Sequence, residues 1–134
     1  MIYFLSFILN SESTKSRRDM EVIEKPWGKE EVIEKNDRYM MKKLTMLAGH
    51  RCSLQYHNIK RETIYVLSGR LRIYTGSNPE DLNSKVYSQN ENITLTPGVI
   101  HRMEAVEDAV YLEASTPEME DVVRLADDYE RAGA

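Results

Sequence analysis

The sequence has little that would cross-link it covalently or hold it in a membrane. Among its 134 residues Cys52 is the only cysteine, so no disulfide bond can form within the chain. A single thiol suits a reducing compartment, and we expect a cytoplasmic protein. The apolar segment 2–9 is too short to span a bilayer, and it lacks the basic residues and the small-residue cleavage site of a signal peptide. We therefore expect no membrane partner.

Neither sign of charge dominates the sequence. The 18 Lys and Arg residues are interspersed with 22 Asp and Glu residues, and the net charge of -4 gives no reason to expect nucleic-acid binding. The length corresponds to one domain, which we place at 21–134. The extension 1–20 is predicted to contain an apolar strand at 2–9, packed on a sheet edge of this chain or of a partner subunit, and then a polar linker. Met20 stands directly before the patterned region, so translation from Met20 instead of Met1 is an alternative interpretation of the extension.

Long helical periods are missing before the C-terminus, and the pattern is one of short strands broken by turn residues. Alternation is clearest at 70–74, where Leu71 and Ile73 are expected to point inward, and Ser68 and Gly69 predict a hairpin turn before it. Many short strands with regular turns indicate an all-β jelly-roll barrel. We expect strands at 30–34, 39–47, 52–57, 62–68, 70–75, 85–88, 92–96, 101–105 and 109–114.

Two segments outside these strands carry signals of their own. An Asn-Pro pair and several polar residues predict a surface loop over 76–84. After the last strand, Ser115 stands three residues before Glu118 with Pro117 between them, which predicts the start of a short C-terminal helix or turn.

Four side chains with metal-binding donor atoms stand out from the strand pattern. Gln55 and His57 share one face of a strand, because strand side chains repeat every two residues. Glu62 opens the next apolar run, and His101 begins a later strand. Two imidazoles, one carboxylate and one amide oxygen suit zinc or another first-row divalent ion if they converge. His50 lies in a predicted turn, and we interpret it as a structural histidine.

The spacing of these residues resembles the two motifs of the cupin superfamily. The chain departs from the superfamily pattern where Gln55 replaces the first histidine and Ala105 replaces a terminal asparagine. Pro97 also stands directly beside Gly98 rather than two residues before it. The residues that carry the two motifs are Gly49, Gln55, His57, Glu62 and Gly69 in the first and Pro97, Gly98 and His101 in the second.

Gln, His, Glu and His in this order form the arrangement of phosphomannose isomerases. The chain is similar to the C-terminal isomerase domain of the bifunctional type II enzymes over residues 22–131. It contains no glycine-rich nucleotide loop of the kind expected in their nucleotidyltransferase half. The segments that recur in those isomerases in the same order are 26–28, 31–33, 38–39, 53–55, 66–69, 98–102 and 120–124.

The resemblance implies a metal-dependent sugar-phosphate isomerase that converts mannose 6-phosphate to fructose 6-phosphate through an enediol. It implies zinc on Gln55, His57, Glu62 and His101, a sugar-phosphate substrate and a homodimer. It also implies catalytic roles for Glu113, Lys60 and Arg124, with Arg102 as a weaker candidate for the substrate phosphate.

The sequence leaves alternatives open for these roles. A glutamate that points into an apolar barrel has a raised pKa, which suits a general base, and this assignment requires Glu113 to face inward. Lys60 would otherwise be a solvated loop residue, and Arg124 an exposed residue on a short helix. Two other functions fit the same motifs: a sugar-recognition cupin that binds metal without turnover, and a cupin that acts on sugar acids as a lyase or hydrolase.

Overall fold

The computed structural model describes residues 14, 16 and 19–131, and these residues contain strands and no helix. The predicted short C-terminal helix or turn is a turn at residues 119–120 rather than a helix, and the all-β class is confirmed. The strands are β1 Glu21–Lys25, β2 Gly28–Lys35, β3 Met40–Met46, β4 Leu54–Tyr56, β5 Glu62–Ser68, β6 Leu71–Asn78, β7 Asp81–Tyr87, β8 Asn92–Leu95, β9 Ile100–Ala105, β10 Ala109–Ser115 and β11 Val123–Ala126.

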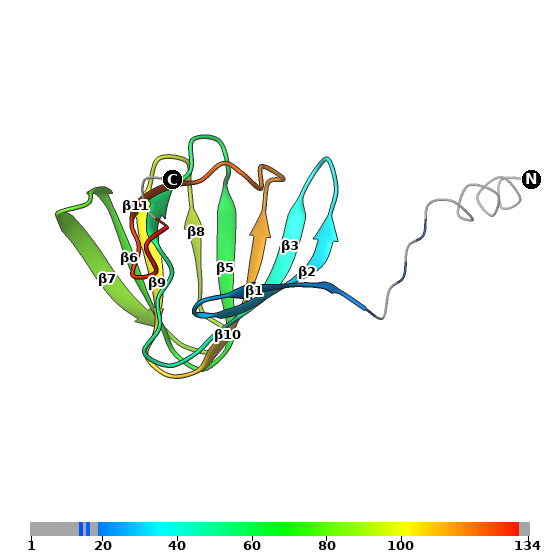
Figure 1. The fold of residues 1–134 in the computed structure, drawn as a ribbon, viewed down its shortest axis with the longest axis horizontal. Coiled ribbons are helices and arrows are strands. Elements are labelled where there is room, and N and C mark those ends of the chain that lie inside the picture. Colours follow the sequence, from blue (N-terminus) through cyan, green and yellow to red (C-terminus); the bar gives the residue numbers. More distant parts are fainter. Residues whose placement is uncertain (1–13, 15, 17–18, 132–134) are drawn as a thin grey trace, which may run out of the picture.

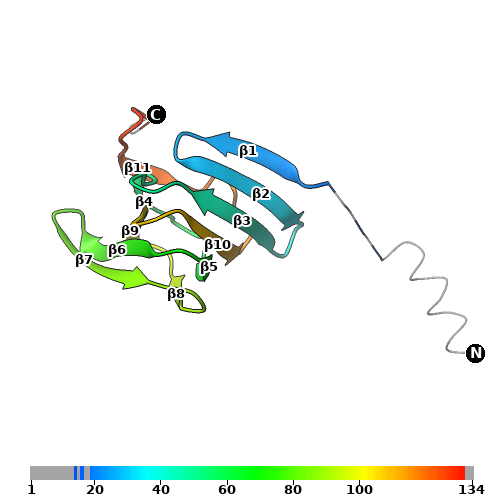
Figure 2. The same ribbon diagram turned by 90° about the horizontal axis from the view of Figure 1, so that it is seen from below.

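The strands form two antiparallel sheets that curve around one interior, as Figures 1 and 2 show. The larger sheet has the order β1-β2-β3-β10-β5-β8, and the smaller has the order β11-β4-β9-β6-β7. Strands that are distant in the chain are neighbours in both sheets. This non-sequential order is typical of a jelly roll, and it confirms the predicted barrel.

The core lies between the sheets because alternate residues of each strand point inward. In β3, Met40, Leu44 and Met46 are buried, and Lys42 occupies an inward position among them. Leu71 and Ile73 of β6 are buried as the alternation predicted. Lys42 is thus a charged residue in an otherwise apolar inward row, and at this position the interior is a pocket rather than apolar core.

Two glycines with positive φ occupy turns before strands, and the first of them lies in the predicted hairpin turn. Gly69, between β5 and β6, has a φ of +77°, and Gly98, before β9, has a φ of +87°. A Cβ atom on Gly69 would lie 2.0 Å from the backbone oxygen of Asp108, whereas a Cβ atom on Gly98 would have no neighbour within 4 Å. The first turn therefore needs glycine for space as well as for conformation.

Three predicted segments differ from the structure. The segment after Ser115 leads to β11, which pairs with β4 in an antiparallel register, so long-range pairing overrides the local helix-start signal. The predicted loop 76–84 is wrong because β6 and β7 continue into a hairpin with only residues 79–80 between them. The sequence pattern also missed β1, the edge strand beside β2. The apolar strand predicted at 2–9 lies outside the described residues.

Candidate metal centre

Three of the four predicted metal ligands converge in the interior. The Nε2 atom of His57 lies 3.2 Å from Glu62 Oε1, and the Nε2 atom of His101 lies 3.0 Å from the same oxygen. One ligand atom from each residue fits within 4.8 Å of the others, and all three residues are buried. His57 directly follows β4, Glu62 begins β5 and His101 lies in β9, so the cluster joins both sheets.

Backbone carbonyls orient both imidazoles of the cluster. The Nδ1 atom of His101 lies 2.9 Å from the oxygen of Val99, and the Nδ1 atom of His57 bonds the oxygen of Asp121. A carbonyl only accepts, so each Nδ1 must donate, and a neutral ring then has a lone pair on Nε2. This is the arrangement of metal-binding histidines, in which the second nitrogen is anchored by a carbonyl or carboxylate.

The donor set fits a divalent cation. His101 Nε2 is buried and lies 3.0 Å from Glu62 Oε1 without the geometry of a hydrogen bond. Burial alone would raise the pKa of Glu62, but contacts with His101 and His57 and the charge of Lys60 hold this pKa well below its ordinary value. Glu62 is therefore an ionised carboxylate facing two imidazole nitrogens, and a metal ion would satisfy all three groups.

Gln55 is placed to be the fourth ligand. It lies directly opposite His101 in the pairing of β4 with β9, so the two side chains share one face of the smaller sheet. Gln55 also lines the same pocket as His57 and Glu62. Its Nε2 atom lies 3.9 Å from the sulfur of Cys52.

Glu113 and Lys60 lie next to the cluster. Glu113, on β10, is 6 % exposed and so faces inward, as its predicted role requires. Burial and the negative charge of Glu62 raise the pKa of Glu113 to about 7, against the opposing effect of Lys60. Lys60 Nζ lies 3.1 Å from Glu113 Oε1 and 3.5 Å from Glu62 Oε2, so it bridges the two carboxylates.

The two predicted arginines have different surroundings. Arg124 lies on β11, opposite Gln55, and it lines the pocket from a strand rather than from the expected helix. Arg102 is not brought into the pocket. It follows His101 on β9 and so points to the other face of the sheet, where its Nε donates to the oxygen of Cys52 at 3.1 Å. Its predicted contact with a substrate phosphate is therefore not supported by its position.

Sequence reasoning missed a second group of charged residues in the pocket. Lys42 Nζ lies 2.9 Å from Glu30 Oε1, and Lys25 Nζ lies 3.8 Å from Glu30 Oε2. Lys42 and Glu30 are both buried. The signal was available in β3, where Lys42 takes an inward position between Met40 and Leu44.

A second missed residue is Asp121, which shapes the loop before β5. Its carboxylate accepts backbone N–H groups of Asn58, Ile59 and Lys60 at 3.0, 2.7 and 2.9 Å. The hydrogen bonds from this loop, that of Lys60 first, lower the pKa of Asp121 to about 2. Asp121 thus orients His57 through its carbonyl and Lys60 through its carboxylate.

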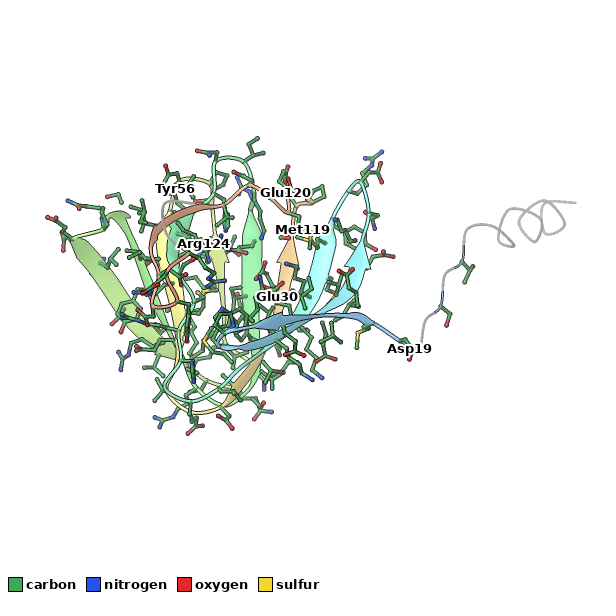
Figure 3. The ribbon with its side chains drawn as sticks, in the orientation of Figure 1. Asp19, Glu30, Tyr56, Met119, Glu120 and Arg124 are labelled. Carbon is green, nitrogen blue, oxygen red and sulfur yellow. The ribbon has the colours of Figure 1, made fainter. Side chains whose placement is uncertain are left out.

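One pocket of about 150 Å³ lies beside the cluster, and its wall includes His57, Glu62 and Glu113. Glu30, Met119 and Arg124, labelled in Figure 3, all belong to its wall. The remaining wall residues are Ile23, Lys25, Lys42, Gln55, His57, Lys60, Glu62, Met103, Glu113 and Val122.

The fold and the buried cluster define the chain as a cupin-type jelly roll. Solved structures with this fold include the capsular polysaccharide assembling protein CapF from Staphylococcus aureus, with a TM-score of 0.71, 19 % identity and coverage of 86 % of this chain and 36 % of CapF. KdgF from Halomonas sp. has a TM-score of 0.66 and 14 % identity over 75 % of this chain and 91 % of KdgF. Oxalate decarboxylase from Bacillus subtilis, which is described with Mn(II) centres, has a TM-score of 0.67 and 20 % identity over 78 % of this chain and 30 % of that protein.

The chain belongs to the mannose-6-phosphate isomerase C-terminal family, whose model matches residues 11–127. A mannose-1-phosphate guanylyltransferase of Escherichia coli K12 is 29 % identical over 92 % of this chain and 26 % of the relative. Mannose-1-phosphate guanylyltransferase ManC of Salmonella typhimurium is 30 % identical over 80 % of this chain and 22 % of the relative. The chain thus spans about a quarter of the length of these curated relatives. No helix in the described part of the chain is long and apolar enough to cross a membrane.

Proposed function

We propose that this cupin is a metal-dependent sugar-phosphate isomerase that interconverts mannose 6-phosphate and fructose 6-phosphate. One observation carries the proposal: the buried carboxyl of Glu113, with a pKa of about 7, shares a pocket with His57 and Glu62 of the metal-ligand cluster. Isomerisation of an aldose to a ketose needs a base that serves two adjacent carbons next to a group that polarises their oxygens. The pocket contains candidates for both.

The proposed metal is zinc, held by Gln55, His57, Glu62 and His101. Zinc is redox-inert and takes nitrogen and oxygen ligands, and when bound it would act as a Lewis acid on the sugar oxygens. The other steps fall to the protein. Glu113 removes a proton from one carbon and returns it to the neighbouring carbon, because its pKa near neutrality suits both directions.

The neighbouring cations would stabilise negative charge on the substrate. Lys60 lies between Glu62 and Glu113 and can donate a hydrogen bond to a sugar oxygen beside the base. Arg124 has a buried Nε without a hydrogen bond to any described residue, so its guanidinium has donors free for an anionic substrate. The relatives carry the name guanylyltransferase, but the chain aligns with only about a quarter of their length. The family model that matches residues 11–127 carries the isomerase name, which supports the proposal.

The proposal is tested with the purified protein, zinc and mannose 6-phosphate, by measuring formation of fructose 6-phosphate. Replacing Glu113 with Gln removes the base but keeps the shape of the side chain, so we expect kcat to fall about 10²- to 10⁴-fold. Glu107→Gln is the matched control, since Glu107 is exposed and paired with Arg70 away from the pocket. Its rate should equal that of the unchanged protein.

The second candidate function is a sugar-recognition cupin without turnover. It is favoured by the ion pair of Lys60 with Glu113, because the carboxylate proposed as the base is already bound to an ammonium group. Bound zinc together with no turnover of any hexose phosphate would contradict the isomerase proposal and support recognition alone. His57→Ala should lower the metal content under both functions. A loss of turnover that accompanies the loss of metal would identify a metal-dependent isomerase, whereas a recognition cupin has no turnover to lose.

A further inference from the structure

Gln55, the proposed fourth metal ligand, lies in the wall of two cavities. The larger one is the pocket whose wall also includes His57 and Glu62. The smaller one has a volume of about 70 Å³, and its described lining includes Cys52 and Ser53 but neither of these two ligands. The side chain of Gln55 therefore borders the pocket of the metal cluster and also the cavity that contains Cys52.

The amide of Gln55 can bind a cation through only one of its two ends. Its oxygen has lone pairs to offer, whereas its NH₂ group has only donors. A half-turn of the amide exchanges the two ends, and the torsion that permits this half-turn has only a weak preference of its own. Gln55 therefore needs a neighbour that distinguishes the NH₂ group from the oxygen.

The sulfur of Cys52 is such a neighbour. Gln55 Nε2 donates to Cys52 Sγ across 3.9 Å, and a thiol sulfur is a weak acceptor with long hydrogen bonds. Cys52 is only 5 % exposed, so solvent competes little for this contact. The contact favours the orientation in which the NH₂ group faces the sulfur and the amide oxygen faces away from it.

Strand β9 fixes Cys52 in place. The backbone N–H of Met103 donates to Cys52 Sγ at 3.2 Å, and the backbone N–H of Cys52 donates to the oxygen of Met103 at 3.0 Å. Arg102 Nε donates to the oxygen of Cys52 at 3.1 Å. Since residues 102 and 103 directly follow His101, the strand that carries one proposed ligand also holds the group that orients another.

His101 gives independent evidence for a ligand at this place. Its ring is 1 % exposed, and its Nε2 atom lies 3.0 Å from Glu62 Oε1 without the geometry of a hydrogen bond. Gln55 lies directly opposite His101 in the pairing of β4 with β9. A cation that binds this nitrogen would therefore lie on the side of the sheet to which Gln55 also points.

We propose that Cys52 is a positioning residue of the metal centre: its sulfur holds the NH₂ group of Gln55, so that the amide oxygen is presented to the metal. This inference rests on the metal-binding part of the proposed function and not on turnover. The competing interpretation is that Cys52 only fills space, because it belongs to the hydrophobic core. Metal affinity separates the two interpretations.

The first experiment measures the Kd of the full chain for zinc by competition with a chromophoric chelator. We expect Cys52→Ala to raise this Kd about tenfold, a loss typical of removing a group that orients a metal ligand. Cys52→Ser should recover part of the affinity, because a hydroxyl oxygen can also accept from the amide. Ser53→Ala is the matched control, since Ser53 is 2 % exposed and adjacent in sequence, and it should change the Kd less than twofold. Thermal melting without metal identifies any variant that fails to fold.

The second experiment repeats Cys52→Ala in a Gln55→Glu background. A carboxylate has two equivalent oxygens, so either of them can face the metal and no neighbour is needed to choose between them. We expect Cys52→Ala to change the Kd for zinc less than twofold in this background. A cysteine that acted only through packing would cause the same loss in both backgrounds.

Equal losses of zinc affinity in the two backgrounds would therefore overturn the proposal. An unchanged Kd in Cys52→Ala, together with loss of zinc in His57→Ala, would also overturn it and would leave the metal centre itself intact. Zinc binding that couples Cys52 to Gln55 in a protein without turnover would support the positioning role and contradict the isomerase proposal alone. Absence of zinc binding to the unchanged protein would contradict the metal centre and this proposal with it.

Discussion

At the scale of single residues, Asp121 links the candidate metal cluster to the loop that carries Lys60. Its carbonyl oxygen accepts from His57, and its carboxylate accepts three backbone N–H groups from residues 58–60. The same few atoms therefore set the ring orientation of one proposed ligand and the position of Lys60. No local pattern in the sequence marks Asp121, because its partners lie more than sixty residues earlier in the chain.

We predict that Asp121→Ala lowers the free energy of unfolding by about 1–2 kcal/mol, since it removes three hydrogen bonds at a partly exposed site. The pKa of Asp121 is lowered from 3.8 to about 2, so its ionised form stabilises the fold above pH 3.8. This contribution is lost as the pH falls from about 4 to about 2. Urea titrations of both proteins at pH 7 and pH 2.5 measure this contribution of Asp121 to the free energy of unfolding.

Asp121→Asn provides the control for this prediction, because an amide keeps one oxygen acceptor but carries no charge. Its stability should lie between those of Asp121→Ala and the unchanged protein at pH 7, and the difference from the unchanged protein should shrink at pH 2.5. A difference that stays constant with pH would show that the charge of Asp121 does not contribute.

At the scale of elements, the hairpin between β5 and β6 depends on Gly69. We predict that Gly69→Ala lowers the free energy of unfolding by about 3 kcal/mol. This value combines the cost of a left-handed conformation for alanine with the cost of the clash between its Cβ and the backbone of Asp108. Gly98→Ala is the matched control, because Gly98 has a similar φ of +87° but open space where its Cβ would lie. It should cost about 1 kcal/mol, the conformational part alone.

Urea denaturation of both glycine variants separates the energetic cost of the steric clash from the cost of the left-handed conformation. Equal losses in Gly69→Ala and Gly98→Ala would contradict the role assigned to the close approach of Asp108. The comparison is informative because the two glycines have similar backbone conformations, whereas the different space around them follows from tertiary packing.

The sequence predicted elements where the local signal and the tertiary contacts agree. Leu71 and Ile73 alternate with polar residues, and β6 buries both of them. The helix expected after Ser115 failed because β11 gains backbone pairing with β4, which no local pattern can show. The alternation in β3 could place Lys42 inward, but its partner Glu30 follows only from the pairing of β2 with β3.

At the scale of the whole molecule, the candidate site exists because the barrel closes. Spacing identified Gln55, His57, Glu62 and His101 as a set, but spacing alone cannot place donor atoms within a few ångströms. The pairing of β4 with β9 sets Gln55 opposite His101, and the fold brings Glu62 from the other sheet. The same closure brings Lys25, Arg124 and Arg131 from the two ends of the domain to one smaller cavity.

A metal that binds this cluster must also stabilise the barrel, since its ligands come from both sheets and are assembled only in the folded chain. At a hundredfold excess of zinc over its Kd we expect a gain of about 2.7 kcal/mol, which corresponds to a rise in Tm of roughly 8–10 °C for a domain of this size. His57→Ala and His101→Ala should each lose most of this shift. His50→Ala should keep the shift, because His50, the one other histidine of the sequence, bonds Tyr129 outside the cluster. Thermal melting followed by circular dichroism, with and without zinc, measures all four proteins. A zinc-dependent shift that persists in His57→Ala and His101→Ala would place the bound metal elsewhere.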